Sequence, residues 1–221
     1  MILEELGLPY ETKYMDFPDM KKDPFETLKP NGRVPAIEDP NTGVNLFEVS
    51  TRQKNSLRIE AKILIAQSGA IIEYLIETYD KSNNLTYTSS PEKYLTKAWL
   101  HFQMSGQGPY FGQRAWFKHF HSEKNITSAI ERYGNEIKRI IGVLDRHLKK
   151  HGTGWLVGDK CTYADLSFVT WDMMLPFLMG DELNTEKDFP NYHAWNQKMM
   201  QRPAVKKIAE DKQKAMASKQ S

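Results

Sequence analysis

The pattern of apolar and polar positions divides the chain into a mixed first part and a helical second part. Short helical and short extended patterns alternate over residues 1–80. The segment MILEELGL predicts a helix that ends at Gly7, and SGAIIEYLIETYD predicts another with Ser68 as its N-cap. Between them, YETKYMDF, PAIED and VNLFE read as strands, and the turn residues DPNTG join the last two. This order is typical of a small α/β unit.

Helical patterns dominate the chain after a polar linker at residues 81–92. The segment PEKYLTKAWLHFQMS predicts a helix that breaks at GQGP, because glycine and proline interrupt helices. Apolar residues then recur every three or four positions in a long helix that ends before Gly152. The TYAD segment, Thr162 to Asp165, predicts a capping box with a structural role. We therefore expect an α/β domain at 1–80 and an all-helical domain at 91–221.

Composition and charge narrow the class of protein. The chain has 221 residues, 40% of them hydrophobic and 26% charged, as in ordinary globular proteins. A net charge of +2 is too small to favour binding to nucleic acid or to an anionic membrane. Cys161 is the only cysteine, which excludes an internal disulfide and favours the cytoplasm. His119 and His121 have no acidic or cysteine cluster beside them, so no metal site is expected.

Five motifs in the same order resemble the cytosolic glutathione transferases. They are NGRVPAIED, FE with SGAIIEYL, SGQGPYFGQ, WLVGDKCTYADLSF and RPAV. FQMSGQGPYFGQ and HFHSEK are more particular to the fungal Ure-type, nitrogen-regulator-like class. The resemblance implies a thioredoxin-like N-terminal domain, a helical C-terminal domain and a homodimer. It also implies conjugation of glutathione to electrophiles, or glutathione-dependent reduction of disulfides, without a metal. The alternative is a non-enzymatic regulator of the same fold that binds a partner protein.

The resemblance also assigns a glutathione site. Val34 precedes Pro35, and a cis bond between them would free the Val34 backbone to pair with the cysteinyl part of glutathione. Glu48 would bind the γ-glutamyl ammonium, while Ser68 and the helix start would bind its carboxylate. Lys22 corresponds to a basic residue expected at the glycine carboxylate, although a solvated surface position is an equal alternative.

The chain departs from the family at its start. MILEEL matches the middle of the family's first helix, so we expect the first strand and the loop with the thiol-activating residue to be absent. No catalytic residue is therefore assigned. Loss of a central strand would leave backbone groups unpaired on its neighbours. Weak glutathione binding, or none, is expected for that reason.

The second departure is an inserted run at residues 49–67, VSTRQKNSLRIEAKILIAQ. Four basic residues and one acid lie in it, and it has neither glycine nor proline. Its removal joins Glu48 to Ser68 and restores the family motif. Because its two ends also fit translated intron borders, we interpret it as a retained intron, with a genuine surface loop as the alternative. On that hypothesis, deletion of 49–67 should stabilise the protein.

Overall fold

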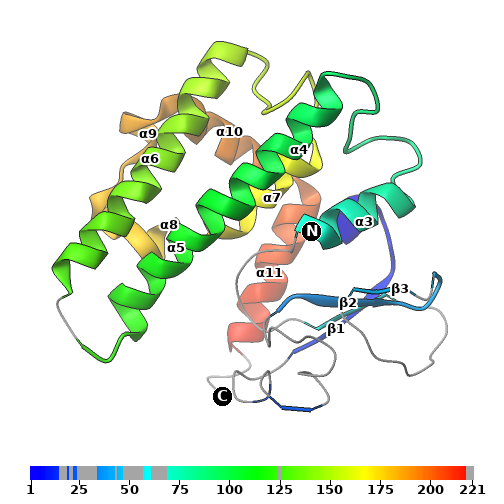
Figure 1. The fold of residues 1–221 in the computed structure, drawn as a ribbon, viewed down its shortest axis with the longest axis horizontal. Coiled ribbons are helices and arrows are strands. Elements are labelled where there is room, and N and C mark those ends of the chain that lie inside the picture. The colour runs from blue at the N-terminus through cyan, green and yellow to red at the C-terminus, as the bar shows by residue number, and fades with distance from the viewer. Residues whose placement is uncertain are drawn as a thin grey trace.

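The computed structural model of the protein describes residues 1–14, 19, 22–23, 34–42, 44–46, 57–60, 69–123 and 126–217. A small sheet with its own helices lies beside a larger group of helices (Figure 1). This arrangement agrees with the predicted α/β unit followed by a helical unit.

The sheet has the strand order β1-β4-β2-β3. Strand β4 is parallel to β1 and antiparallel to β2, and β3 is antiparallel to β2. The predicted strands are confirmed in their described parts, and β4 is the one that the sequence analysis missed. The strands are β1 (Tyr10–Lys13), β2 (Ala36–Asp39), β3 (Val44–Leu46) and β4 (Leu57–Glu60).

Strand β4 comes from the inserted run and occupies the centre of the sheet. Ile59 lies opposite Thr12 on one side and opposite Ile37 on the other. The expectation that the neighbours of a missing strand have unpaired backbone is therefore wrong for β1 and β2. The surface-loop alternative is also wrong for these four residues. Their sequence, LRIE, alternates apolar and charged residues, and this alternation is the local signal that predicts a strand.

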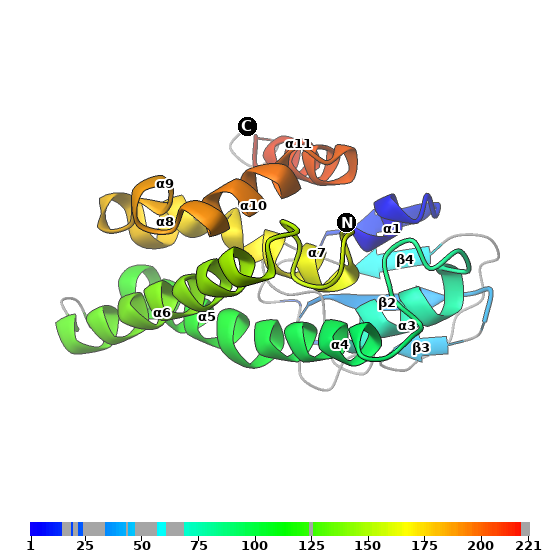
Figure 2. The ribbon, with the colours of Figure 1, turned by 90° about the horizontal axis from the view of Figure 1, so that it is seen from above.

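Helices α1 (Ile2–Glu5) and α3 (Gly69–Tyr79) pack against each other beside the sheet (Figure 2). Gly7 follows α1 with a φ of +63°, a backbone conformation that glycine adopts without strain. The apolar face predicted for α3 is confirmed, although Tyr79 at its end is only half-buried. The buried residues of the two helices are Ile2, Leu3, Ile71, Ile72, Leu75 and Ile76.

The predicted helix break at GQGP is wrong, because helical turns continue from α4 (Glu92–Phe102) to the end of η3 (Trp116–Phe120). The π-helical turn η2 (Gln103–Gln107) leads directly into α5 (Gly108–Ala115). Pro109 lies in the first turn of α5, where its missing N–H is tolerated. Gly108 packs next to Trp171, and an added Cβ would lie at ordinary contact distance, 3.6 Å, from the indole nitrogen. Packing and the wider turn thus override the local breaker signal.

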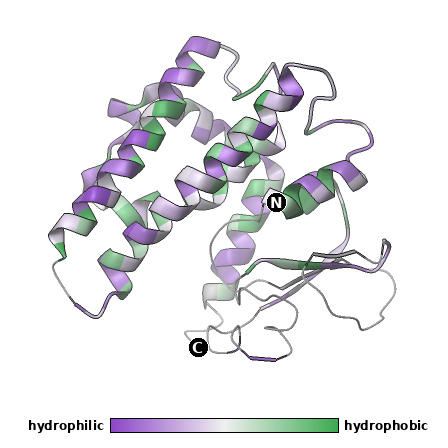
Figure 3. Ribbon diagram, viewed as in Figure 1, coloured by the Kyte–Doolittle hydropathy of each residue, from purple (hydrophilic) through white to green (hydrophobic). Residues whose placement is uncertain are grey.

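Helix α6 (Thr127–His151) runs antiparallel to α4 and α5 (Figure 1). It ends at Gly152, whose φ is +77°, as predicted for a helix C-terminus. Apolar residues of these helices face one another, and polar residues cover the outside (Figure 3). The remaining elements are α7 (Tyr163–Asp172), α8 (Leu175–Met179), η4 (Gly180–Glu182), α9 (Thr185–Asp188), α10 (Pro190–Met200) and α11 (Pro203–Ala217).

Asp165 confirms the predicted capping box at the start of α7. Its Oδ2 accepts the backbone N–H and the hydroxyl of Thr162, both at 2.9 Å. Its Oδ1 accepts the Leu156 N–H at 3.0 Å and the Trp195 indole N–H at 2.9 Å. Burial raises the pKa of this carboxyl, and the four donors offset part of that effect. The four donor groups come from Thr162, Leu156 and Trp195, so Asp165 links the start of α7 to the preceding loop and to Trp195. These contacts agree with a structural role.

Candidate functional site

The start of β2 carries Val34 and Pro35, both half-buried. The bond between them is cis, as the sequence analysis expected. The next residue, Ala36, is buried and lies opposite Glu60 of β4. These two predicted site residues thus directly precede a residue that is paired with the inserted run.

The other end of β2 is fixed to α3 through Asp39. This buried carboxylate accepts hydrogen bonds from the hydroxyls of Tyr74 and Tyr79, and from the Asn41 N–H at 2.9 Å. Burial alone would raise the pKa of Asp39, but these hydrogen bonds outweigh it and hold the pKa below its ordinary value. Burial and the bond to Asp39 together raise the pKa of Tyr74 to about 12. The orientation of α3 relative to β2 is therefore set by buried polar contacts.

The first residue of α3 faces the helical unit. A Cβ added at Gly69 would lie 3.3 Å from Cγ of Met104 and 3.6 Å from Cδ2 of Leu100. Met104 belongs to the π-turn η2, so this irregular turn lies against the N-terminal end of α3. Backbone N–H groups at a helix start attract anions, and this helix start lies at the boundary between the α/β unit and the helical unit.

For three predicted site residues, the structure describes no contact with the residues around the start of α3. Glu48 and Ser68 lie outside the described residues. Lys22 is exposed, and its ammonium contacts Asp19 at 3.4 Å across side chains that are 66% and 57% exposed. This contact agrees with the solvated alternative for Lys22.

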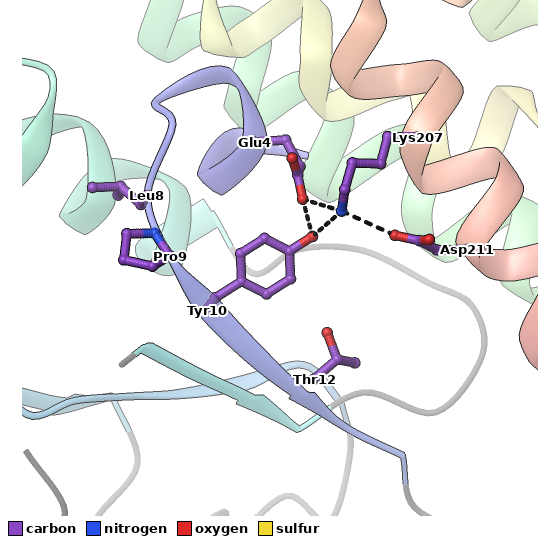
Figure 4. A pocket seen from close by; sticks show the side chains of 7 residues that line it. All are labelled: Glu4, Leu8, Pro9, Tyr10, Thr12, Lys207 and Asp211. Carbon is purple, nitrogen blue, oxygen red and sulfur yellow. Dashed lines mark hydrogen bonds and ion pairs between the residues drawn. The ribbon is translucent and has the colours of Figure 1, made fainter. Parts of the chain in front are cut away.

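A separate pocket of about 400 Å³ lies where α11 meets α1 and β1 (Figure 4). Lys207 reaches Glu4, Asp211 at 3.1 Å and the Tyr10 hydroxyl at 3.4 Å, while that hydroxyl donates to Glu4. Three acceptors thus match the three N–H groups of the ammonium. The charged pocket residues contact one another, so this cluster fastens α11 to the N-terminal unit.

A second ion pair strengthens the same junction. The Arg202 guanidinium binds the Glu5 carboxylate through two hydrogen bonds of 2.6 Å. Helix α11 follows Arg202 directly and passes over α1 (Figure 2). Burial alone would raise the pKa of Glu4, but hydrogen bonds from Lys207 and Tyr10 keep it below its ordinary value. Sequence reasoning missed these contacts because the partners lie at opposite ends of the chain.

The residues that the structure describes form neither a metal site nor a membrane-spanning helix. There, no three histidine, cysteine or acidic side chains are grouped so as to hold a metal ion. Within the same residues, every helix is too short or too polar to cross a membrane. Burial raises the pKa of the Cys161 thiol far above its usual range, which is opposite to the change that makes a thiol reactive.

Comparison with known proteins identifies the family. Residues 1–78 match the glutathione S-transferase N-terminal domain, and residues 113–212 match the glutathione S-transferase C-terminal domain. The glutathione S-transferase-like protein OpS6 of Beauveria bassiana is 47% identical over 212 residues, which cover 96% of this chain and 88% of that protein. The chain belongs to the glutathione S-transferase family.

Solved structures place this transferase chain near the Ure2-type members. The glutathione transferase URE2P5 of Phanerochaete chrysosporium superposes with a TM-score of 0.84 at 35% identity, over 100% of this chain and 90% of that one. The same protein has been cocrystallized with 1-(S-glutathionyl)-2,4-dinitrobenzene, with a TM-score of 0.79 at 36% identity and coverage of 98% and 88%. URE2P6, from the same organism and in complex with oxidized glutathione, has a TM-score of 0.80 at 40% identity and coverage of 96% and 89%. The predicted family, class and two-part fold are thus confirmed.

Proposed function

We propose that this chain binds glutathione at the seam between its two units and conjugates it to a small electrophile. The observation that carries this proposal is the closeness of Gly69 to Met104 and Leu100, whose side chains would lie 3.3 Å and 3.6 Å from an added Cβ. The N-terminal end of α3 therefore lies next to the helical unit. A peptide carboxylate bound at that helix end would leave the rest of glutathione beside the helices, where a second substrate can meet its thiol.

Each end of glutathione has a proposed partner. The Val34 backbone pairs with the cysteinyl part, next to β2. Glu48 and Ser68 bind the γ-glutamyl ammonium and carboxylate, as the family resemblance implies. Lys22 is the weakest of the proposed contacts, because its ammonium already has an acidic neighbour in Asp19.

The proposed reaction is a substitution at an electrophilic carbon. The glutathione thiol loses its proton to solvent, its sulfur forms a bond to the carbon, and the leaving group departs with the electron pair of the bond that breaks. No described residue is assigned to lower the thiol pKa. The conjugate bound to URE2P5 supports this reaction. We also propose that the chain reduces disulfides with glutathione. The oxidized glutathione bound to URE2P6 supports this second reaction.

The chain is also proposed to act as a cytoplasmic homodimer. Helix α4 exposes 65% of Tyr94 and 47% of Leu95, and adjacent apolar side chains of this kind favour association. Sedimentation of the purified chain measures the oligomeric state directly.

Turnover of an activated aromatic halide tests the proposed activity. The full chain is mixed with glutathione and a 1-halo-2,4-dinitrobenzene, and the absorbance of the conjugate is followed against a sample without protein. We expect a rate above that of the uncatalysed reaction. Glutathione binding without any increase in rate would favour the alternative, a non-enzymatic regulator that binds a partner protein.

A further inference from the structure

We propose that strand β4 (Leu57–Glu60) of the inserted run is a working part of the site, because it holds in place the residues that are proposed to meet glutathione. The role in binding rests on the proposed function, whereas the role in the sheet does not. This proposal replaces the hypothesis of a dispensable, retained intron.

Strand β4 pairs on both sides. Its four residues lie opposite Tyr10–Lys13 of β1, and three of them lie opposite residues 36–38 of β2. A strand with two neighbours satisfies their N–H and C=O groups together with its own. Its removal would leave both neighbours with unpaired backbone, which the fold must then expose to water or bury at a cost.

Within the described residues, strand β1 joins the sheet through β4 alone, since the strand order is β1-β4-β2-β3. Without β4, the sheet separates into β1 alone and the β2–β3 pair. The contacts of α1 with α3 and of α11 with α1 would remain, but no described strand would connect β1 to β2.

The pairing of β4 with β2 extends to Ala36, the residue next to the proposed glutathione site. Within the described residues, β3 pairs with Ile37, Glu38 and Asp39 of β2, whereas Ala36 is paired by Glu60 of β4. Ala36 directly follows Pro35. The far end of β2 is held by the contacts of Asp39 with α3. Among the described strands, β4 is therefore the one that pairs with β2 at the end next to Val34 and Pro35.

The composition of the run suits a central strand. Proline cannot donate a hydrogen bond to a neighbouring strand, and glycine weakens a strand interior. The run contains neither. That absence is unusual for a surface loop, but it is what a segment with a strand paired on both sides requires.

Amide hydrogen exchange tests the inference, with the full chain as reference. One variant lacks residues 49–67, and a second has Leu57–Glu60 replaced by Gly-Ser-Gly-Ser at unchanged length. The matched control has residues 51–54 replaced in the same way. We expect exchange in β1 and β2 to accelerate by about tenfold or more in both variants, and to stay unchanged in the control.

Single substitutions keep the test valid if the larger changes prevent folding. Ile59→Pro removes an N–H and also distorts the strand backbone, whereas Ile59→Val keeps a β-branched residue, so only the former should accelerate exchange in the neighbouring strands. Unchanged or slower exchange in β1 and β2 after deletion of 49–67 would overturn the inference. Loss of protection together with no glutathione binding by the full chain would instead support β4 and reject the proposed function.

Discussion

Ala36 of β2 and Glu60 of the inserted run lie directly opposite each other in neighbouring strands. Ala36, which follows Pro35, is therefore paired with the inserted run, a segment that departs from the family pattern. The expected weak binding of glutathione depended on an empty centre of the sheet, and β4 fills that place. For the same reason we now expect deletion of 49–67 to destabilise the protein, which is the opposite of the sequence-based expectation.

Glu48→Ala should weaken glutathione binding by the full chain. A hydrogen bond to a charged group contributes about 1.5–3 kcal/mol, which corresponds to about a 10- to 150-fold rise in Kd. Glu131→Ala, on the exposed side of α6, is the control and should leave Kd unchanged. Equal Kd values for both variants would remove Glu48 from the proposed site.

Glu5 and Arg202 should couple the two units measurably. Their side chains are only 10% and 27% exposed and share two hydrogen bonds of 2.6 Å. A double-mutant cycle with Glu5→Ala and Arg202→Ala should give a coupling free energy of about 1–2 kcal/mol in urea unfolding. The control cycle uses Glu136 and Arg139, a more exposed pair on one helix, for which about 0.5 kcal/mol or less is expected. Equal coupling in the two cycles would contradict this role for the α11 junction.

Gly158→Ala should destabilise the connection between the linker and the helical unit. Gly158 has a φ of +60°, and an added Cβ would lie 2.2 Å from the Tyr87 hydroxyl oxygen. We expect a loss of about 2 kcal/mol or more in the free energy of unfolding. Gly152→Ala is the matched control, since its φ is also positive but no atom lies within 4 Å, and about 1 kcal/mol is expected. Similar losses for the two variants would show that Tyr87 does not approach Gly158 in solution.

Asp172 should make stability depend on pH. Burial raises its pKa to about 7, while Gln107 donates to it at 2.8 Å and Asn196 at 3.2 Å. In the unfolded chain, an aspartate has a pKa of about 3.9. Between that pKa and the folded pKa, the folded chain binds one more proton than the unfolded chain. The free energy of unfolding therefore falls as pH rises from about 4 to 7.

Asp172→Asn should reduce the slope of unfolding free energy against pH by about 1 kcal/mol per pH unit. Asp181→Asn, at an exposed position, is the control and should leave the slope unchanged. Unfolding free energies across this pH window measure the slopes. Identical slopes for the wild-type chain and Asp172→Asn would contradict the raised pKa.

The sequence was sufficient where structure is local. The apolar faces of α3 and α6 and the capping box at Thr162 depend on residues within a few positions of one another. The β2 strand was predicted from the PAIED segment and the turn residues that follow it. Strand β4 was missed because its partners, such as Thr12 and Ile37, are distant in sequence, and pairing between distant segments leaves only a short alternating signal.

Two other features depend on packing that local rules do not contain. GQGP predicts a break, yet Gly108 fits against Trp171 and the π-turn accommodates Pro109. The junction of Glu4 and Glu5 with Lys207 and Arg202 joins the two ends of the chain. Glu48 and Ser68 stay predictions, because they lie outside the described residues.

Titration of glutathione into two forms of the chain tests the central claim most directly. One form is the full chain, and the other has Leu57–Glu60 replaced by Gly-Ser-Gly-Ser. The account predicts millimolar or tighter binding by the full chain, and binding at least about tenfold weaker once β4 is lost. Equal or tighter binding by the replaced chain would contradict the claim that the inserted strand holds the glutathione site in place.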